Sequence, residues 1–190
     1  MEYYIVFEGE IDLLNSKKLA DAILAINNDP NINSNVNQIR LFMSSYGGST
    51  YHGFALATII QNSKIPISIH ATNHIDSIAN VVFLSAKIEH RTSESHAKFF
   101  VHGASKGGNY DERALNETLS AIKAENHRIA TFISENSKLT LEQVKEKMQI
   151  GETMSAKDAL QFGYISQLVH KTIPLNSQRY DIISLPEPIK

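Results

Sequence analysis

The chain has 190 residues, of which 42% are hydrophobic and 20% are charged, the composition of an ordinary globular protein. Its formal net charge of -2 argues against a basic surface for nucleic acid or membranes, and the absence of cysteine excludes disulfides, thiolate catalysis and cysteine-bound zinc. No apolar run reaches the roughly 18 residues that span a bilayer, and the N-terminus lacks a signal-peptide pattern. We therefore expect a cytoplasmic protein.

Strand and helix patterns alternate through the first two thirds of the chain. β-branched and aromatic residues predict strands at 3–8, 38–44 and 65–71, and two shorter ones around 88–91 and 98–101. Apolar residues at helical spacing predict helices at 15–27, 49–61 and 77–86. The alternation favours an α/β fold with a parallel sheet and crossover helices, in a single domain over residues 1–190.

The last third begins with the longest predicted helix, at about 109–136, where Asn109 and Glu112 have the spacing of a capping box. Thr140 and Gln143 have the same spacing and predict the start of a second helix that ends near Met148. A short helix at 155–162 and a strand at 164–169 follow. The tail at about 171–190 shows little periodicity, so we expect it to be irregular or to dock on a neighbour.

A glycine pair and a serine follow two of the predicted strands, at the sheet edge where ligands gather. Gly47 and Gly48 let the backbone approach a substrate, and the helix start after them leaves N–H groups that can stabilise an oxyanion. An ordinary tight turn explains the same residues. Ser77 opens an apolar helix, where the helix dipole favours a nucleophile, but a helix cap by Ser77 or Asp76 is the simpler interpretation.

His102 closes an apolar strand and is a candidate general base near neutral pH. His70 and His74 compete with it for that role, and a polar residue at a strand end explains all three. Glu152, which precedes the last helix, either orients the base or is a solvated loop residue.

Taken together, these features resemble the proteolytic subunit of the Clp protease, over a stretch that begins at Phe7 and ends at Val169. The turn 45–49 has the pattern Ser-x-Gly-Gly-Ser, Ser77 lies 29 residues after Gly48, and His102 lies 25 residues after Ser77, all without gaps. The segments 154–159 and 162–165 are similar to the family's closing helix and strand. Because these spacings occur together, they favour a catalytic role for Ser77 and His102 over the structural one.

The resemblance implies a ClpP/crotonase fold and a serine endopeptidase. Ser77 would attack the peptide carbonyl, His102 would take its proton, and the backbone N–H groups of Gly48 and Ile78 would hold the oxyanion. A peptide or unfolded protein would bind as an added strand beside the glycine pair and the stretch after His102. The helix at 109–136 would be a handle through which two stacked heptameric rings of a homo-oligomer interlock.

The same resemblance includes three departures from the family. The family's third catalytic residue, an aspartate, falls on Gly151, so that Glu152 is the nearest carboxylate. Asp76 precedes the nucleophile where the family has small residues. The chain begins almost at its first predicted strand, without the axial loop that docks an unfoldase ring, so an ATPase partner does not follow.

Two other functions stay open at this point. Gly151 and Asp76 motivate a catalytically weak or silent subunit that keeps the fold. A crotonase-like acyl-CoA binder is the third reading, because that related fold also uses a glycine-rich oxyanion turn, although the serine-histidine spacing argues against it. We expect no metal and no cofactor: the histidines lack a carboxylate at ligand spacing, and residues 103–108 lack the context of a dinucleotide fingerprint.

Overall fold

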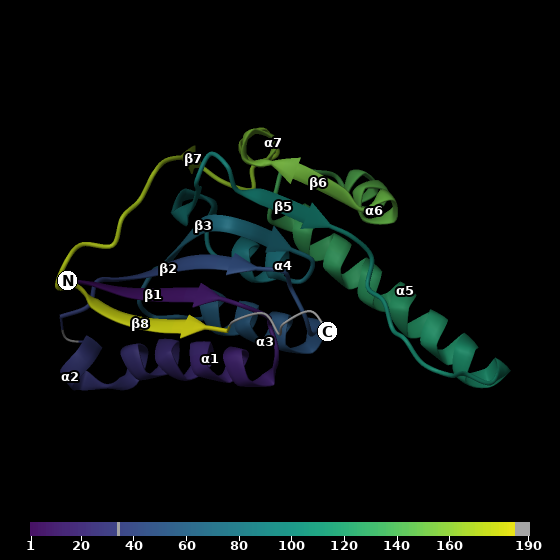
Figure 1. The fold of residues 1–190 in the computed structure, drawn as a ribbon, viewed down its shortest axis with the longest axis horizontal. Coiled ribbons are helices and arrows are strands. Elements are labelled where there is room, and N and C mark those ends of the chain that lie inside the picture. The colour runs from purple at the N-terminus through teal and green to yellow at the C-terminus, as the bar shows by residue number, and fades with distance from the viewer. Residues whose placement is uncertain (34, 185–190) are drawn as a thin grey trace.

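The computed structural model describes residues 1–33 and 35–184 (Figure 1). The main path of its eight-stranded sheet has the order β6-β5-β3-β2-β1-β8, and β4 pairs with both β3 and β7. The strands are β1 (Glu2–Glu8), β2 (Gln38–Ser45), β3 (Ile67–Asp76), β4 (Arg91–Ser93), β5 (Lys98–Val101), β6 (Glu152–Ser155), β7 (Gln167–Leu168) and β8 (Gln178–Ile183). The helices are α1 (Leu13–Asn28), α2 (Pro30–Asn33), α3 (Thr50–Gln61), α4 (Ala79–Leu84), α5 (Glu112–Glu135), α6 (Leu141–Ile150) and α7 (Ala156–Gln161), and Ile88–His90 form a 3₁₀ turn.

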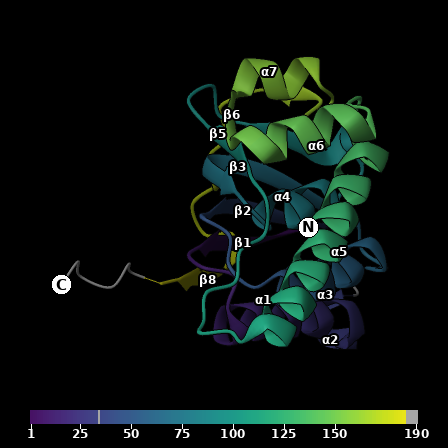
Figure 2. The same ribbon diagram turned by 90° about the vertical axis from the view of Figure 1, so that its right-hand side faces the viewer.

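The predicted parallel sheet is confirmed at its centre. Strand β1 pairs in parallel with β2 and β8, β2 with β3, and β3 with β4 and β5, whereas β6 runs antiparallel to β5. Helices α1, α3, α4 and α5 follow one another along one side of this sheet (Figure 2). Parallel strands force the chain back across the sheet each time, and helices make those crossovers.

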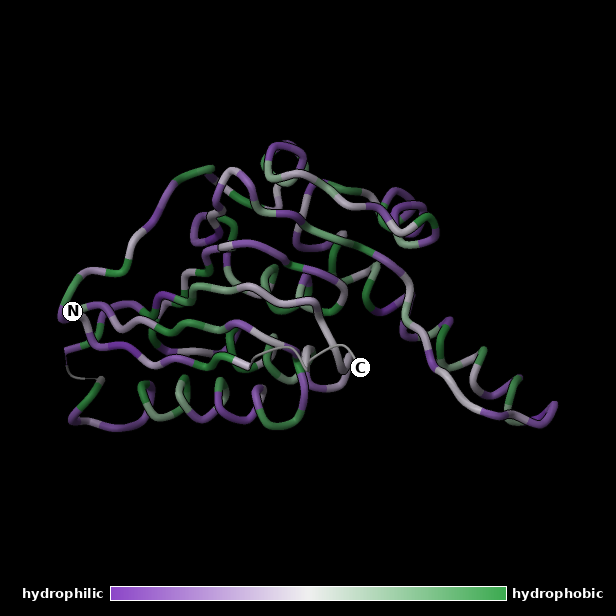
Figure 3. Tube along the Cα trace, in the orientation of Figure 1, coloured by the Kyte–Doolittle hydropathy of each residue, from purple (hydrophilic) through white to green (hydrophobic). Residues whose placement is uncertain are grey.

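The core lies between the sheet and these helices. Alternate residues of β2, namely Ile39, Leu41 and Met43, are at most 1% exposed, which is the pattern of a strand with one face in the core. Figure 3 shows the same apolar segments along the strands and an alternation of apolar and hydrophilic segments along the outer helices. Each such large side chain stabilises the fold by about 1.5–3 kcal/mol.

Several predicted boundaries are wrong. The third strand continues to Asp76, and the helix after it begins at Ala79, not at Ser77. Helix α5 begins at Glu112, where the side chain of Asp111 accepts a hydrogen bond from the N–H of Ala114, so the predicted cap at Asn109 is wrong. The predicted capping box of Thr140 at α6 is confirmed.

The C-terminal region holds two strands that the sequence did not indicate. No strand was expected at 152–155, where a helix was predicted to begin at Ser155, but these residues form β6. Residues 178–183 belong to the tail that was expected to be irregular or to dock on a neighbour, and they form β8 beside β1. In contrast, the strand expected at 164–169 is only Gln167–Leu168. The remainder of the tail, residues 185–190, lies outside the described residues.

Helix α5 extends beyond the sheet (Figure 1). Its second half packs on the core through Ile129 and Ile133, which are 5% and 1% exposed. In its first half, Leu115 and Leu119 are 55% and 47% exposed, although they lie one turn apart on the same face. The part of the chain that the structure describes holds no helix long and apolar enough to cross a membrane.

Candidate active site

Ser77 occupies a sharp turn between β3 and α4. Its φ of 56° lies in the left-handed region, which serine rarely adopts and which costs of order 1–3 kcal/mol. The N–H of Ser77 donates to the carbonyl of Phe100 at 2.8 Å, and α4 has no side-chain cap. Ser77 is therefore not a helix cap. It is a strained residue held between two neighbouring strands.

The glycine pair packs directly against this turn. Gly47 has a φ of 95°, and a Cβ atom there would lie 2.6 Å from Ser77 Cβ and 3.2 Å from Ser77 Oγ. Gly48 has a φ of 141°, and its Cβ would lie 2.7 Å from the carbonyl oxygen of Ile11. Both positions therefore require glycine, and this requirement brings the backbone of residues 47–48 next to the Ser77 side chain.

Two backbone donors at this turn have no acceptor in the described part of the chain. The neighbouring N–H groups are satisfied: Gly47 donates to Ser45 Oγ at 3.1 Å and Ser49 donates to the carbonyl of Ile11 at 2.9 Å. The N–H groups of Gly48 and Ile78 donate to no acceptor among residues 1–33 and 35–184. Ile78 is 1% exposed, and nearly all buried N–H groups in proteins are paired, so its free donor is unusual. Gly48 is exposed, so its N–H is accessible to a ligand. Two such donors next to one serine are suited to an incoming oxyanion.

His102 stands where the chain leaves β5. Its Nδ1 lies 2.7 Å from the carbonyl oxygen of Gly103, and its ring stacks on Phe100 with centroids 4.9 Å apart. A carbonyl oxygen only accepts, so Nδ1 carries the proton and Nε2 keeps the lone pair that a general base needs. No hydrogen bond joins His102 to the Ser77 hydroxyl within the described residues. Phe100 nevertheless ties the two, because its carbonyl holds Ser77 and its ring holds His102.

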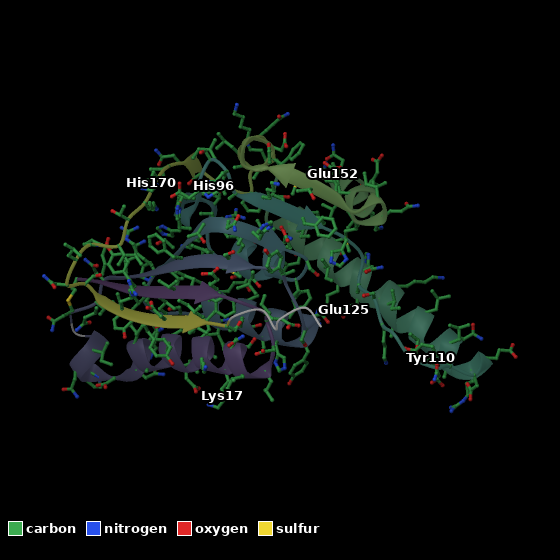
Figure 4. The ribbon with its side chains drawn as sticks, viewed as in Figure 1. Lys17, His96, Tyr110, Glu125, Glu152 and His170 are labelled. Atoms are coloured by element: carbon green, nitrogen blue, oxygen red, sulfur yellow. The ribbon has the colours of Figure 1, made fainter. Side chains whose placement is uncertain are left out.

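Glu152 lies on β6, opposite Val101 in the strand register (Figure 4). Its Oε1 accepts a hydrogen bond from Lys147 Nζ at 2.6 Å. Within the part of the chain that is described, no hydrogen bond links Glu152 to His102. The structure thus places this carboxylate on a lysine, and its expected role of orienting the base has no contact to support it.

Gly151 ends α6 in the left-handed conformation, with a φ of 68°. A Cβ at this position would lie 3.6 Å from the Phe100 ring, which is an ordinary contact. Glycine has no side chain, so this position, where the resemblance places the family's aspartate, supplies no carboxylate to His102.

The competing histidines have other partners. The ring of His70 is buried on β3, with Nδ1 2.9 Å from Thr92 Oγ1 and Nε2 3.1 Å from Glu94 Oε1. Burial lowers the pKa of His70, against the opposing effect of the Glu94 hydrogen bond. The Nδ1 of His74 lies 3.4 Å from Asp76 Oδ2. Both imidazoles are therefore engaged by carboxylates, whereas His102 makes no hydrogen bond or ion pair with a carboxylate among residues 1–33 and 35–184.

Comparison with known proteins decides the family. Residues 1–172 match the family described as Clp protease. This chain belongs to the Clp protease family.

Its relatives within the family are distant. The chain is 25% identical over 136 residues to the ATP-dependent Clp protease proteolytic subunit of Porphyromonas gingivalis, a match that covers 70% of this chain and only 60% of the relative. It is 25% identical over 171 residues to proteolytic subunit 1 of Gloeobacter violaceus, covering 87% of this chain and 82% of the relative. A solved point mutant of ClpP1 from Listeria monocytogenes has a TM-score of 0.78 at 19% identity, over 88% of this chain and 91% of that one. This last likeness shows the ClpP-like fold.

Asp76 is a buried carboxylate directly before the candidate nucleophile. It is 8% exposed, its Oδ1 accepts from the N–H of Phe100 at 3.2 Å, and its Oδ2 faces His74. Burial raises the pKa of Asp76, while His74, the Phe100 N–H and His102 oppose that shift. One oxygen is thus held by the backbone of β5 and the other by the side chain of His74 on β3.

Asn80 is a site residue that the sequence did not reveal. It is 0% exposed, and its Nδ2 donates to the carbonyls of Ser77 at 3.0 Å and Phe100 at 2.9 Å. One side chain therefore fixes the turn that carries the serine and the strand that leads to the histidine. The signal was its position as the single polar residue in the apolar run 78–84.

Proposed function

We propose that this Clp protease family member hydrolyses peptide bonds, with Ser77 as nucleophile and His102 as general base. The observation that carries the proposal is the pair of unpaired N–H groups, from Gly48 and Ile78, on either side of a serine held at a φ of 56°. The strained backbone of Ser77 and the buried, unpaired N–H of Ile78 both cost stability, and such features occur together where a structure is built to stabilise a transition state.

In the proposed reaction, Ser77 Oγ attacks the carbonyl carbon of the scissile bond and its proton passes to His102 Nε2. The oxyanion of the tetrahedral intermediate accepts hydrogen bonds from the N–H groups of Gly48 and Ile78. His102 then returns the proton to the leaving amine, which completes the acyl-enzyme. Water, deprotonated by the same imidazole, hydrolyses the ester and restores Ser77.

The segment after His102 supports binding of an extended peptide. Gly103 donates to the carbonyl of Met148 at 3.1 Å and Ala104 to Asn126 Oδ1 at 2.7 Å, so the start of the segment is fixed. Residues 105–110 pair with no strand among the described residues, and of their backbone groups only the Lys106 and Gly107 carbonyls accept a hydrogen bond there, from the Tyr110 hydroxyl. The other backbone groups are open to pairing with a substrate strand.

The exposed half of α5 supports the oligomeric chamber that the resemblance implies. Leu115 and Leu119 form an apolar stripe on a helix half that projects away from the sheet. A second copy of this chain that packs against that stripe would bury it. The homo-oligomer and its enclosed chamber are part of the proposal.

A weak or silent subunit is the second candidate, and one observation favours it. The acceptor for His102 Nδ1 is the neutral carbonyl of Gly103, not a carboxylate. In serine proteases, replacing the orienting aspartate by its amide costs about 10⁴-fold in turnover. A carbonyl preserves the tautomer but supplies no charge to the imidazolium, so we expect slow hydrolysis with a nucleophile that still reacts.

Labelling with a fluorophosphonate probe tests the proposal. We expect wild type to be labelled covalently and Ser77→Ala not to be labelled. Ser95→Ala is a matched control, since Ser95 is exposed and distant in sequence from the turn. Labelling that survives in Ser77→Ala, or that is absent from folded wild type, would overturn the assignment. Labelling of wild type without measurable peptide turnover would favour the weak subunit.

A further inference from the structure

A hollow of about 760 Å³ lies beside His102, between the segment that follows β5 and helices α5 and α6. His102, Gly103 and Gly151 form the wall nearest the candidate site. Polar and charged side chains come from the two helices: Lys123, Asn126, His127, Lys145 and Gln149. The proposed mechanism uses none of these helix residues.

The charge of the lining is one-sided. Lys123 and Lys145 line the hollow from α5 and α6, and no aspartate or glutamate of residues 1–33 and 35–184 lines it, although the chain as a whole has a net charge of -2. Neither lysine has a carboxylate partner in the described ranges. Like charges without counter-ions repel one another, so an anion placed between them would be favoured.

Four carboxylates lie close to these lysines in sequence: Glu142 and Glu146 are exposed on α6 and do not line the hollow, and the other two are paired with other cations. Glu125 lies 3.7 Å from Arg128, and Glu152 lies 2.6 Å from Lys147. The side chains that line the hollow therefore include lysines but no carboxylate from these four residues.

The hollow is also held open by the structure. The hydrogen bond from the Gly103 N–H to the Met148 carbonyl links the segment after β5 to α6. The hydrogen bond from the Ala104 N–H to Asn126 links the same segment to α5. Only the oxygen of the Asn126 amide is used in this way. Its Nδ2, which would lie 3.3 Å from a Cβ at Gly103, remains a donor without a partner in the described part of the chain. A pre-formed site of this kind binds with little ordering cost.

We propose that this hollow is a carboxylate-binding site, with Lys123 and Lys145 as counter-charges and Asn126 as the hydrogen-bond donor. The carboxylate is the acidic side chain of a peptide that lies along the segment after His102, or a free small carboxylate. Its negative charge would lie beside the imidazole whose Nδ1 has only a carbonyl acceptor. The substrate arm of this inference rests on the proposed peptidase, whereas the binding arm does not.

The binding arm uses Ser77→Ala, which cannot turn over a peptide, and two peptides that differ only by glutamate or glutamine. We expect the glutamate peptide to bind about fivefold more tightly, as two partly exposed ion pairs would provide. The double variant Lys123→Glu/Lys145→Glu should lose this preference. Lys18→Glu, an exposed lysine on α1, is the matched charge change that should keep it.

The second arm separates the two sources with acetate and glutarate. If they compete with the glutamate peptide and, alone, change the rate at which wild-type Ser77 is labelled, the site takes free carboxylates. If only the peptide binds, the site reads a substrate side chain.

Equal binding of the glutamate and glutamine peptides, with no competition by acetate or glutarate, would overturn the inference. Normal labelling of Ser77 in that case would leave the peptidase proposal intact. A glutamate preference that depends on the two lysines, together with no labelling of wild type, would support the carboxylate site and overturn the peptidase.

Discussion

Ser77 and His102 belong to the same candidate site but are held in different ways. Ser77 lies at the end of a central strand, with Gly47 packed on its side chain and Asn80 bound to its carbonyl. His102 is the first residue beyond a short strand, and its contacts are the next carbonyl and one stacked ring. The nucleophile is fixed by backbone that cannot move without disrupting the sheet. The base is held by a loop and lines the hollow between that loop, α5 and α6. Substitutions around the base should therefore tune activity without unfolding the sheet.

The largest effect should come from the rigid half. We expect Gly47→Ala to lower the rate at which Ser77 is labelled by at least about a hundredfold. It should also lower the free energy of unfolding by roughly 3 kcal/mol. The added methyl group would lie 2.7 Å from the carbonyl oxygen of Asp76 and 2.6 Å from Ser77 Cβ, at a φ of 95°. Labelling kinetics and chemical denaturation measure the two effects.

Gly107→Ala is the control for this substitution. Gly107 has nothing within 4 Å of its would-be Cβ, so its replacement should leave the free energy of unfolding unchanged. If Gly47→Ala were labelled as fast as wild type, the glycine pair would not shape the site, and the contrast between the two halves would lose its basis.

The same contrast explains what the sequence could predict. Strands β1 to β3, helices α1 and α3 and the glycine turn depend on local periodicity and on backbone freedom at Gly47 and Gly48, which are visible in sequence. The spacing of Ser77 and His102 was informative because it resembles the family's own spacing, with no insertion or deletion between the two residues. These parts form the nucleophile half of the site and the sheet beneath it.

The rest depends on pairings that leave no local pattern. Strand β8 pairs with β1, which lies at the other end of the chain. Its own residues show no local pattern, so the sequence did not predict it as a strand. The left-handed φ of Ser77 accompanies the hydrogen bond from its N–H to the carbonyl of Phe100 on β5, a contact between distant parts of the sequence. The partner of Glu152 is decided by the end of α6, where Lys147 comes within 2.6 Å. Sequence spacing alone could not choose between Lys147 and His102.

A smaller effect is expected at Asp76, between the two halves. Burial raises the pKa of this carboxyl, so the folded state holds its proton at a pH where the unfolded chain, with an ordinary pKa near 3.9, has lost it. Stability from this group is therefore present at low pH and is lost as the pH rises through the raised value. Asp76→Asn should remove that slope and raise the free energy of unfolding at pH 7 by up to about 1 kcal/mol.

Denaturant titrations of wild type and Asp76→Asn from pH 4 to pH 8 measure this difference. Asp21→Asn, on the exposed face of α1, should leave the slope unchanged. A variant that is less stable than wild type at every pH would mean that the bonds to His74 and Phe100 outweigh the cost of burying the charge.

The smallest effect is expected at Glu152, on the His102 side of the site. Its carboxylate is bound to Lys147, and both side chains are partly exposed, so Glu152→Gln should lower the free energy of unfolding by less than about 1 kcal/mol. Because His102 Nδ1 donates to the Gly103 carbonyl, the rate of Ser77 labelling should stay within about twofold of wild type. Lys147→Met removes the same ion pair from the other side and should behave alike. A large loss of labelling in Glu152→Gln alone would mean that Glu152 leaves Lys147 to support His102 during the reaction, and the base would then be held as firmly as the nucleophile.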